Sequence, residues 1–333
     1  MKTRPSTSAF IASACFAAFL AAIPSGCAGN VEFDGLRAME SLKKQVAFGP
    51  RVPATKAHDS CRDYLVAALK PNVDSVQLQH FQWTRRIRPA SYRETLKLPS
   101  NLPVPASATY PMDNIVAVVK GTDGKDPGLL LCAHWDSRPT ADNEAIPADR
   151  LKPIDGANDG ASGAAVLVEL ARVFHQKRPL SGVIFVLFDG EDLGPDVANM
   201  LLGAAYYAKH PIPNKPREGI LLDMIGDADL AIYKEGYSAD AARELNDTVF
   251  KTAIRLGYTK QFRDEVRLTI DDDHIPLNLH GIKTIDLIDF DYPDAYNMKT
   301  TYWHTLKDTP DKCSAASLEA VGRTLAAVVY ERK

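Results

Sequence analysis

The sequence predicts an α/β protein, a three-layer sandwich in which helices cover both faces of a central mixed, mostly parallel sheet. Short, nearly continuous apolar runs alternate with longer segments of helical periodicity, and such runs are typical of strands buried on both faces. The first two strand-like runs, 76–83 and 114–121, have no predicted helix between them. We therefore expect part of the sheet to be antiparallel.

The remaining elements follow from the same two patterns. Apolar runs rich in β-branched residues predict the strands, and apolar positions spaced three and four residues apart predict the helices. The expected strands are 76–83, 114–121, 128–137, 183–188, 219–227 and 283–290, and the expected helices are 34–48, 56–70, 160–177, 200–209, 239–256 and 314–331. The strongest helical pattern is "ASGAAVLVELARVFHQKR" at 160–177.

Composition indicates an ordinary globular chain. Of its 333 residues, 45% are hydrophobic and 24% are charged, and the net charge is -3. This charge gives no general attraction to nucleic acid or anionic lipid, so neither is expected as a partner. No internal repeat or Pro/Gly/Ser-rich linker divides the chain, and we expect one domain over 28–333.

The N-terminal segment predicts export. Lys2 and Arg4 precede an apolar stretch over 9–23 that is too short to span a bilayer and suits the core of a signal peptide. The segment ends in "IPSGCAGN", which resembles the lipobox of bacterial lipoproteins, in which the cysteine carries the lipid. We therefore expect 1–27 to be a signal peptide and the protein to be periplasmic, anchored to the cell envelope through Cys27, or secreted.

Three cysteines remain after this segment: Cys61, Cys132 and Cys313. Cys132 falls within a buried strand, so a disulfide in an exported protein would join Cys61 to Cys313. Free buried thiols are the alternative, because a core of this size needs no covalent link.

Acidic residues and histidines gather where predicted strands and helices end or begin. The strand at 183–188 is followed directly by Asp189, Glu191 and Asp192. Glu191 and Asp192 are adjacent, and the repulsion between their carboxylates raises the free-energy cost of ionising both. Comparable positions elsewhere hold His134, Asp136, Asp159, Asp223, Asp272, His274 and His304. Ligands of open α/β sheets bind beyond the carboxyl ends of the strands, where these side chains would converge.

A divalent cation would offset the electrostatic repulsion between these carboxylates. Imidazole and carboxylate groups are the ligands that zinc accepts when cysteine is not used, and a catalytic site leaves one coordination position open. One member of the Glu191–Asp192 pair could then bind the metal while the other acts as a general base. Five histidines outside this group are interpreted as structural or surface residues: His58, His80, His175, His210 and His280.

Several motifs resemble the zinc aminopeptidase family that also contains the glutaminyl-peptide cyclotransferases. They are "FGPRVPATKAH", "AHWDS", "GANDGASG", "FDGED", "LLDMIGD", "DDHIP" and "YWHT", in this order over essentially the whole chain after the signal segment. The stretches "HWDSRPTADNE", "DDHIP" and "YWHT" are more similar to the single-zinc glutaminyl cyclases, the bacterial ones above all.

The resemblance implies cyclisation of an N-terminal glutamine of a peptide or protein to pyroglutamate, with release of ammonia. It implies one zinc ion held by Asp159, Asp192 and His304, with Asp192 where many relatives have Glu. It implies Glu191 as the group that moves the proton, and Asp223 and Asp272 as partners of the substrate amine and the leaving amide. Trp303 would form an apolar wall of the substrate pocket.

Two other functions stay open at this point. A two-zinc aminopeptidase would add His134 and Asp223 as ligands of a second metal, with Asp159 between the two ions. A non-catalytic binding protein of the cell envelope could keep the same fold, although it would have no use for Glu191 beside a metal ligand. Two positions depart from the cyclase pattern: Met200 stands near a tryptophan position, and Asp286 stands where some cyclases have histidine.

Overall fold

The computed structural model describes Met1, residues 32–290 and residues 302–332. The predicted signal segment, including Cys27, therefore falls outside the described residues except for Met1. Among the helices of the described ranges, none has both the length and the apolar character needed to cross a membrane.

The described residues form the predicted three-layer sandwich around a six-stranded sheet in the order β1-β2-β4-β3-β5-β8. Its strands are β1 (Ser75–Arg85), β2 (Ala108–Val119), β3 (Leu129–His134), β4 (Val183–Phe188), β5 (Glu218–Asp223) and β8 (Lys283–Ile288). Strands β4, β3, β5 and β8 are mutually parallel, and β2 pairs antiparallel with both β1 and β4. The mixed, mostly parallel sheet and its antiparallel part are both confirmed.

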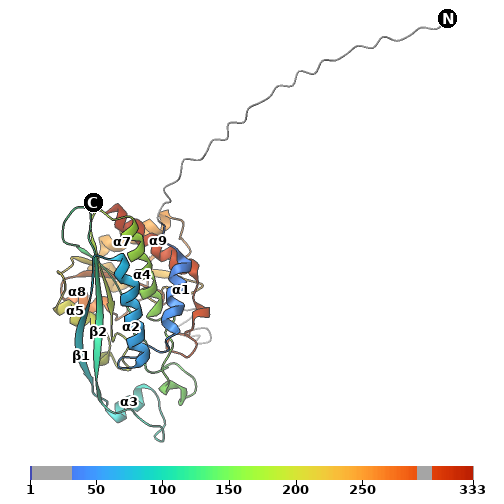
Figure 1. Ribbon diagram of the computed structural model, residues 1–333. Helices are drawn as coiled ribbons and strands as arrows, with labels where there is room; N and C mark the ends of the chain where they lie inside the picture. Colours follow the sequence, from blue (N-terminus) through green and yellow to red (C-terminus); the bar gives the residue numbers. More distant parts are fainter. Residues whose placement is uncertain (2–31, 291–301, 333) are drawn as a thin grey trace. The chain divides into compact units, whose positions relative to one another are not determined.

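Helices cover both faces of this sheet (Figure 1). One face is covered by α1 (Gly35–Val46), α2 (Lys56–Leu69), α4 (Ala161–Gln176), α7 (Arg243–Arg255) and α9 (Ala315–Glu331). The other is covered by α5 (Leu202–Lys209) and α8 (His274–Leu279), with α6 (Gly236–Ala241) packed beside β8.

Alternation along the strands explains the two layers. In β4, Phe185 and Leu187 point into the larger core with α4, whereas Ile184, Val186 and Phe188 point into the smaller core with α5. Because successive strand residues face opposite sides, a strand that is buried on both faces is apolar at every position. This is the pattern that the sequence shows.

Four features differ from the expected elements, and the first is α8 (His274–Leu279), which none of the expected helices covers. The predicted helix 239–256 is divided at Ala242, whose φ of -141° and ψ of 48° are not helical, into α6 and α7. A short helix, α3 (Pro89–Thr95), lies between β1 and β2, where Tyr92, Leu96 and Leu98 form a small core of their own. A separate two-stranded parallel sheet joins β6 (Ile232–Lys234) to β7 (Phe262–Val266). Short segments of this kind carry too little periodicity to be found from sequence.

Of the two alternatives for the cysteines, the structure has the free thiols and not the disulfide between Cys61 and Cys313. Cys61, Cys132 and Cys313 are free, buried thiols. Cys61 packs on the inner face of α2, and Cys313 precedes α9 in an isolated β-bridge with Asp227. Burial raises the pKa of the Cys61 thiol to about 12, so it packs as a small apolar side chain.

Candidate metal centre

The carboxyl ends of the parallel strands bring the predicted site residues together. His134 is the last residue of β3 and Asp223 is the last of β5. Glu191 and Asp192 follow β4, and Asp159 lies two residues before the first residue of α4. These residues and His304, from the loop before α9, are buried.

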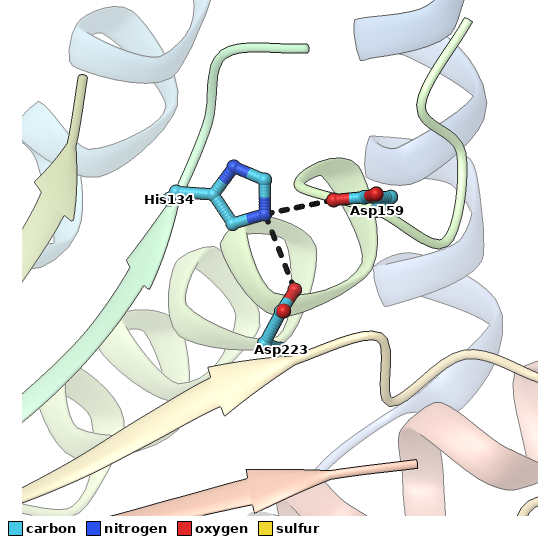
Figure 2. A group of neighbouring side chains, drawn as sticks. All are labelled: His134, Asp159 and Asp223. Atoms are coloured by element: carbon cyan, nitrogen blue, oxygen red, sulfur yellow. Dashed lines mark hydrogen bonds and ion pairs between the residues drawn. The ribbon is translucent and has the colours of Figure 1, made fainter. Parts of the chain in front are cut away.

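Two groups of side chains meet at Asp159. In the first, His134 Nε2 lies 3.2 Å from Asp159 Oδ1 and 3.2 Å from Asp223 Oδ1 (Figure 2). In the second, His304 Nε2 lies 3.5 Å from Asp159 Oδ2 and 3.5 Å from Asp192 Oδ1. We call them the His134 triad and the His304 triad.

Both triads suit a small divalent cation. Zinc bonds of about 2.0–2.1 Å in tetrahedral geometry separate neighbouring ligand atoms by roughly 3.3–3.4 Å. The separations in both triads, 3.2 and 3.5 Å, agree with this value. In the His304 triad, Asp159 Oδ2 and Asp192 Oδ2 are also buried with no hydrogen-bond partner among the described residues. Unpartnered buried carboxylate oxygens beside an imidazole are a donor set that fits zinc.

Asp159 and Asp223 have raised pKa values, as expected for carboxyl groups buried close to other carboxyl groups. Burial, with the charge of Asp192, raises the pKa of Asp159. Burial, with the charge of Asp272, raises the pKa of Asp223. Burial lowers the pKa of His134, but its hydrogen bonds to Asp136, Asp159 and Asp223 outweigh this, so the net shift is upward.

Glu191 is held beside the triads by its backbone. Asp136 accepts the backbone N–H of Glu191 at 3.2 Å and that of Asp192 at 3.1 Å. The Glu191 carboxylate lies 3.8 Å from His134 Nδ1, and burial together with the charge of Asp192 raises its pKa well above the ordinary value. A carboxyl group with a raised pKa beside a metal site is suited to accept and return a proton.

Asp192 has the opposite electrostatic environment. Its carboxylate is fully buried, which by itself would raise its pKa, but the Arg138 guanidinium and His304 hold the pKa well below the usual range. Sequence reasoning missed Arg138. The only local signal was its place four residues after the end of a strand, in "HWDSRPTAD".

The loop that carries Asp159 is fixed by groups that the sequence did not identify. Asp308 accepts the backbone N–H groups of Asn158 at 2.8 Å and of Asp159 at 3.1 Å. Arg51 donates to the carbonyl oxygens of Asp155 and Gly156. Gly160, with a φ of +96°, lies so close to β3 that an added Cβ would be 2.9 Å from His134 Cε1.

A cavity of about 500 Å³ opens onto the His304 triad and onto Asp223 of the His134 triad. Glu191, Asp223 and Asp272 line it, together with Met200. Trp303 also lines it and stacks on His304, with ring centroids 3.9 Å apart, and it contacts Phe290 edge to face at 4.9 Å. The structure therefore brings together the residues that were predicted to take part in the site.

Asp286 lies behind Asp272. It is buried, its Oδ2 is 3.9 Å from His274 Nδ1, and its backbone N–H donates to Ser238. Burial raises the pKa of Asp286 well above the ordinary value, and Asp272, within hydrogen-bond reach, raises it further. The proximity of the two carboxyl groups therefore favours the protonated form of Asp286, which can donate a hydrogen bond to Asp272.

Asp189, the first acidic residue after β4, does not take part in the site. Its carboxylate accepts a hydrogen bond from His58 Nε2 at 2.9 Å and from the Asp113 backbone N–H at 2.7 Å. His58 also stacks on Trp135. Asp189 therefore ties α2 and β2 to the end of β4, which agrees with the structural role expected for His58.

The comparisons with known proteins agree with this geometry. The family model described as "Peptidase family M28" matches residues 114–329, which include both triads and Glu191. The chain belongs to peptidase family M28. M28 is a zinc-dependent family, and a donor set of imidazole and carboxylate groups fits that metal.

Solved structures of this M28 fold cover most of the chain. A glutaminyl cyclase from Tannerella forsythia is 36% identical, with a TM-score of 0.80, covering 91% of this chain and 100% of the other. A leucine aminopeptidase precursor from Bacteroides thetaiotaomicron is 35% identical, with a TM-score of 0.77, covering 91% of this chain and 98% of the other.

Among curated relatives, Aminopeptidase YwaD of Bacillus subtilis is 26% identical over 243 residues, 70% of this chain and 47% of the relative. A probable zinc metalloprotease of Pyrenophora tritici-repentis is 30% identical over 198 residues, 56% of this chain and 41% of the relative. The chain thus spans less than half the length of these curated relatives.

Proposed function

We propose that this M28 protein cyclises the N-terminal glutamine of peptides or proteins and holds one zinc ion in the His304 triad. One observation carries the single-metal assignment. Among the described residues, Asp159 Oδ2 and Asp192 Oδ2 are the buried triad oxygens that have no hydrogen-bond partner, and both belong to the His304 triad. In the His134 triad, the imidazole hydrogen-bonds to Asp223, so a proton on Nε2 can link the two side chains without a second metal.

The cavity provides a separate group for each part of this reaction. Asp223 and Asp272 line it near Glu191 and would bind the α-amine of the substrate and its departing nitrogen. Trp303 and Phe290 supply an apolar wall for the methylene groups of the glutamine side chain. Binding amine and carboxamide of one residue in this space favours ring closure, because both reacting groups are already in one molecule.

The proton balance assigns a role to Glu191. The α-amine forms a bond to the carboxamide carbon of the glutamine side chain, and the bond from that carbon to the amide nitrogen breaks. Glu191 takes the proton that the amine loses and gives it to the departing nitrogen, which leaves as ammonia. Zinc bound by Asp159, Asp192 and His304 would supply Lewis acidity that polarises the carboxamide.

A two-zinc aminopeptidase is the second candidate, and a specific observation favours it. The His134 triad also has the ligand separations of a zinc site, and Asp159 is common to both triads. Similarity to a leucine aminopeptidase precursor supports this alternative, as similarity to glutaminyl cyclases supports the first. A non-catalytic binding protein is the third candidate, but the buried Glu191 beside the metal site argues for catalysis.

Two substrates distinguish these functions. A glutamine-terminated peptide should release ammonia, and a leucine-terminated peptide of equal length should release no leucine. Release of leucine with no release of ammonia would favour the peptidase over the cyclase. The absence of both products, together with the absence of bound zinc, would support the binding protein.

Zinc content provides a second test of the same proposal. The wild-type protein should bind one zinc ion, and His134→Ala should keep it, because His134 lies outside the His304 triad. His304→Ala should weaken zinc binding by more than the roughly 10- to 100-fold typical of an outer-shell partner. Two zinc ions in the wild type, with one lost in His134→Ala, would favour the aminopeptidase.

We also propose that the chain is exported, that 1–27 is a signal peptide of the lipoprotein or the ordinary secretory type, and that 28–333 acts as one catalytic domain. The support is the charged start and the apolar stretch over 9–23. Mass spectrometry of the mature protein tests this, since a lipidated Cys27 at the N-terminus, ordinary cleavage and an uncleaved Met1 give different masses.

A further inference from the structure

Arg138 connects the metal centre to a second carboxylate. It follows β3 by four residues and is 3% exposed. Its Nη1 donates to Asp192 Oδ1, while Nε and Nη2 donate to Asp142 Oδ2 at 2.7 and 2.5 Å. One guanidinium thus joins the buried Asp192 carboxylate to the half-buried Asp142 carboxylate, and the two come from different loops.

The loop after β4 is shaped to hold this guanidinium. The Pro195 carbonyl oxygen accepts a hydrogen bond from Arg138 Nη2 at 3.3 Å. A Cβ at Gly194 would lie 2.8 Å from Cζ, Nη1 and Nη2 of Arg138, so only glycine leaves room for the group. Gly194 also has a φ of +38°, a conformation that favours glycine.

The contacts of Arg138 determine how Asp192 faces the metal centre. Arg138 occupies one side of Asp192 Oδ1, and Oδ2 has no partner among the described residues. Asp142, on the other side of the guanidinium, places its Oδ2 4.0 Å from His304 Nδ1. The Arg138–Asp142 pair therefore lies directly behind two of the three side chains of the His304 triad.

We propose that Arg138, anchored by Asp142, is a positioning residue that fixes the Asp192 carboxylate in the orientation needed to bind zinc. This rests on the zinc site of the proposed function, but not on which reaction the site performs. Two effects of Arg138 oppose each other. Its positive charge repels a cation, whereas its hydrogen bonds orient a ligand that would otherwise turn or move. We infer that the orientation effect is the larger, as is usual for outer-shell partners of metal ligands.

Zinc affinity of the chelator-treated protein tests this, measured by competition with a chromophoric chelator. Arg138→Met should bind zinc about 10- to 100-fold more weakly than the wild type. Arg138→Lys keeps the charge but loses the planar fork that reaches both carboxylates, and it should also bind more weakly. Unchanged or tighter binding in both variants would overturn the proposal, because loss of repulsion alone predicts tighter binding.

Asp142 gives an independent check through a double variant. Asp142→Asn should weaken zinc binding, and Arg138→Met combined with Asp142→Asn should bind no more weakly than Arg138→Met alone. A further loss in the double variant would overturn the role of Asp142 as an anchor that works through Arg138.

The matched control is Arg62→Met, since Arg62 binds Asp59, Asp63 and Asp113 and does not line the cavity. Its zinc affinity should equal that of the wild type. Thermal unfolding of each metal-free variant confirms that the fold persists. Since zinc affinity is measured without a substrate, failure of the cyclase proposal leaves this test intact.

Discussion

Glu191 and Asp192 are neighbours in sequence but lie in opposite electrostatic surroundings. Arg138 contacts the Asp192 carboxylate and holds its pKa low, whereas burial and the Asp192 charge raise the pKa of Glu191. When environments separate the pKa values of two adjacent carboxyl groups, one stays an anion and the other can exchange a proton. This difference in pKa explains how two acidic residues that follow one buried strand can have different roles.

Replacing Glu191 by glutamine tests, at the residue scale, whether Glu191 is the residue that exchanges the proton. Glu191→Gln removes the proton acceptor and keeps the size of the side chain, so turnover should fall by about 10²- to 10⁴-fold. Zinc content should not change, because the His304 triad is intact. Ammonia release and metal analysis on one preparation measure both effects.

The exposed Glu244→Gln on α7 is the matched control and should be as active as the wild type. Full activity of Glu191→Gln would refute the assigned role.

At the scale of elements, α4 connects the sheet to the metal centre. Asp159 precedes this helix, and Gly163 in its first turn faces β3 and β5. An added Cβ at Gly163 would collide with Leu222 O and lie 2.8 Å from Ala133 Cβ. The close approach of helix and strands therefore fixes where Asp159 lies relative to His134 and Asp223.

Gly163→Ala should consequently reduce stability and zinc affinity together. Overpacking of this kind costs about 1–3 kcal/mol, and the displaced helix would carry Asp159 with it. Thermal unfolding and chelator competition measure the two effects. Gly128→Ala is the matched control, because an added Cβ there meets only the flexible Arg217 side chain at 3.3 Å. Equal behaviour of the two variants would contradict the proposed coupling.

At the scale of the whole molecule, the fold buries carboxyl groups that titrate well above their usual range. Burial, with the charge of Asp159, raises the pKa of Asp308 to about 7, and burial raises the pKa of Asp189 to about 6 even though His58 opposes it. The metal-free folded protein therefore binds more protons than the unfolded chain between about pH 4 and pH 7.

The sign of the pH dependence follows from this difference in bound protons. The stabilising contribution of these groups is present below the pKa of the unfolded chain and is lost as pH rises through the folded values. Carboxyl groups with lowered pKa values, such as Asp192 and Glu235, act in the opposite direction, but they titrate mainly below about pH 4. Zinc binds the deprotonated ligands, so its stabilising effect should grow over the same range.

We therefore expect the difference in Tm between zinc-loaded and metal-free protein to widen from pH 5 to pH 7.5. Differential scanning calorimetry at constant ionic strength measures it. A difference that stays constant or narrows would contradict the assignment of a metal to this group of carboxylates.

The sequence by itself determined the layers of the fold and most of the site. Continuous apolar runs such as 183–188 require burial on both faces, and His134 and Asp223 end two such runs. Because parallel strands end at one edge of a sheet, local pattern was enough to predict that these side chains meet.

Only the tertiary structure decided which groups hold the site residues in place. Arg138 meets Asp192 across 54 positions, and Asp308 meets Asp159 across 149. The tertiary structure also places Asp189 in hydrogen-bond contact with His58, and it leaves Cys61 and Cys313 as free thiols. Contacts between distant segments depend on how loops pack after the sheet has formed. No local periodicity records that packing, so positions and partners of this kind follow from the folded chain alone.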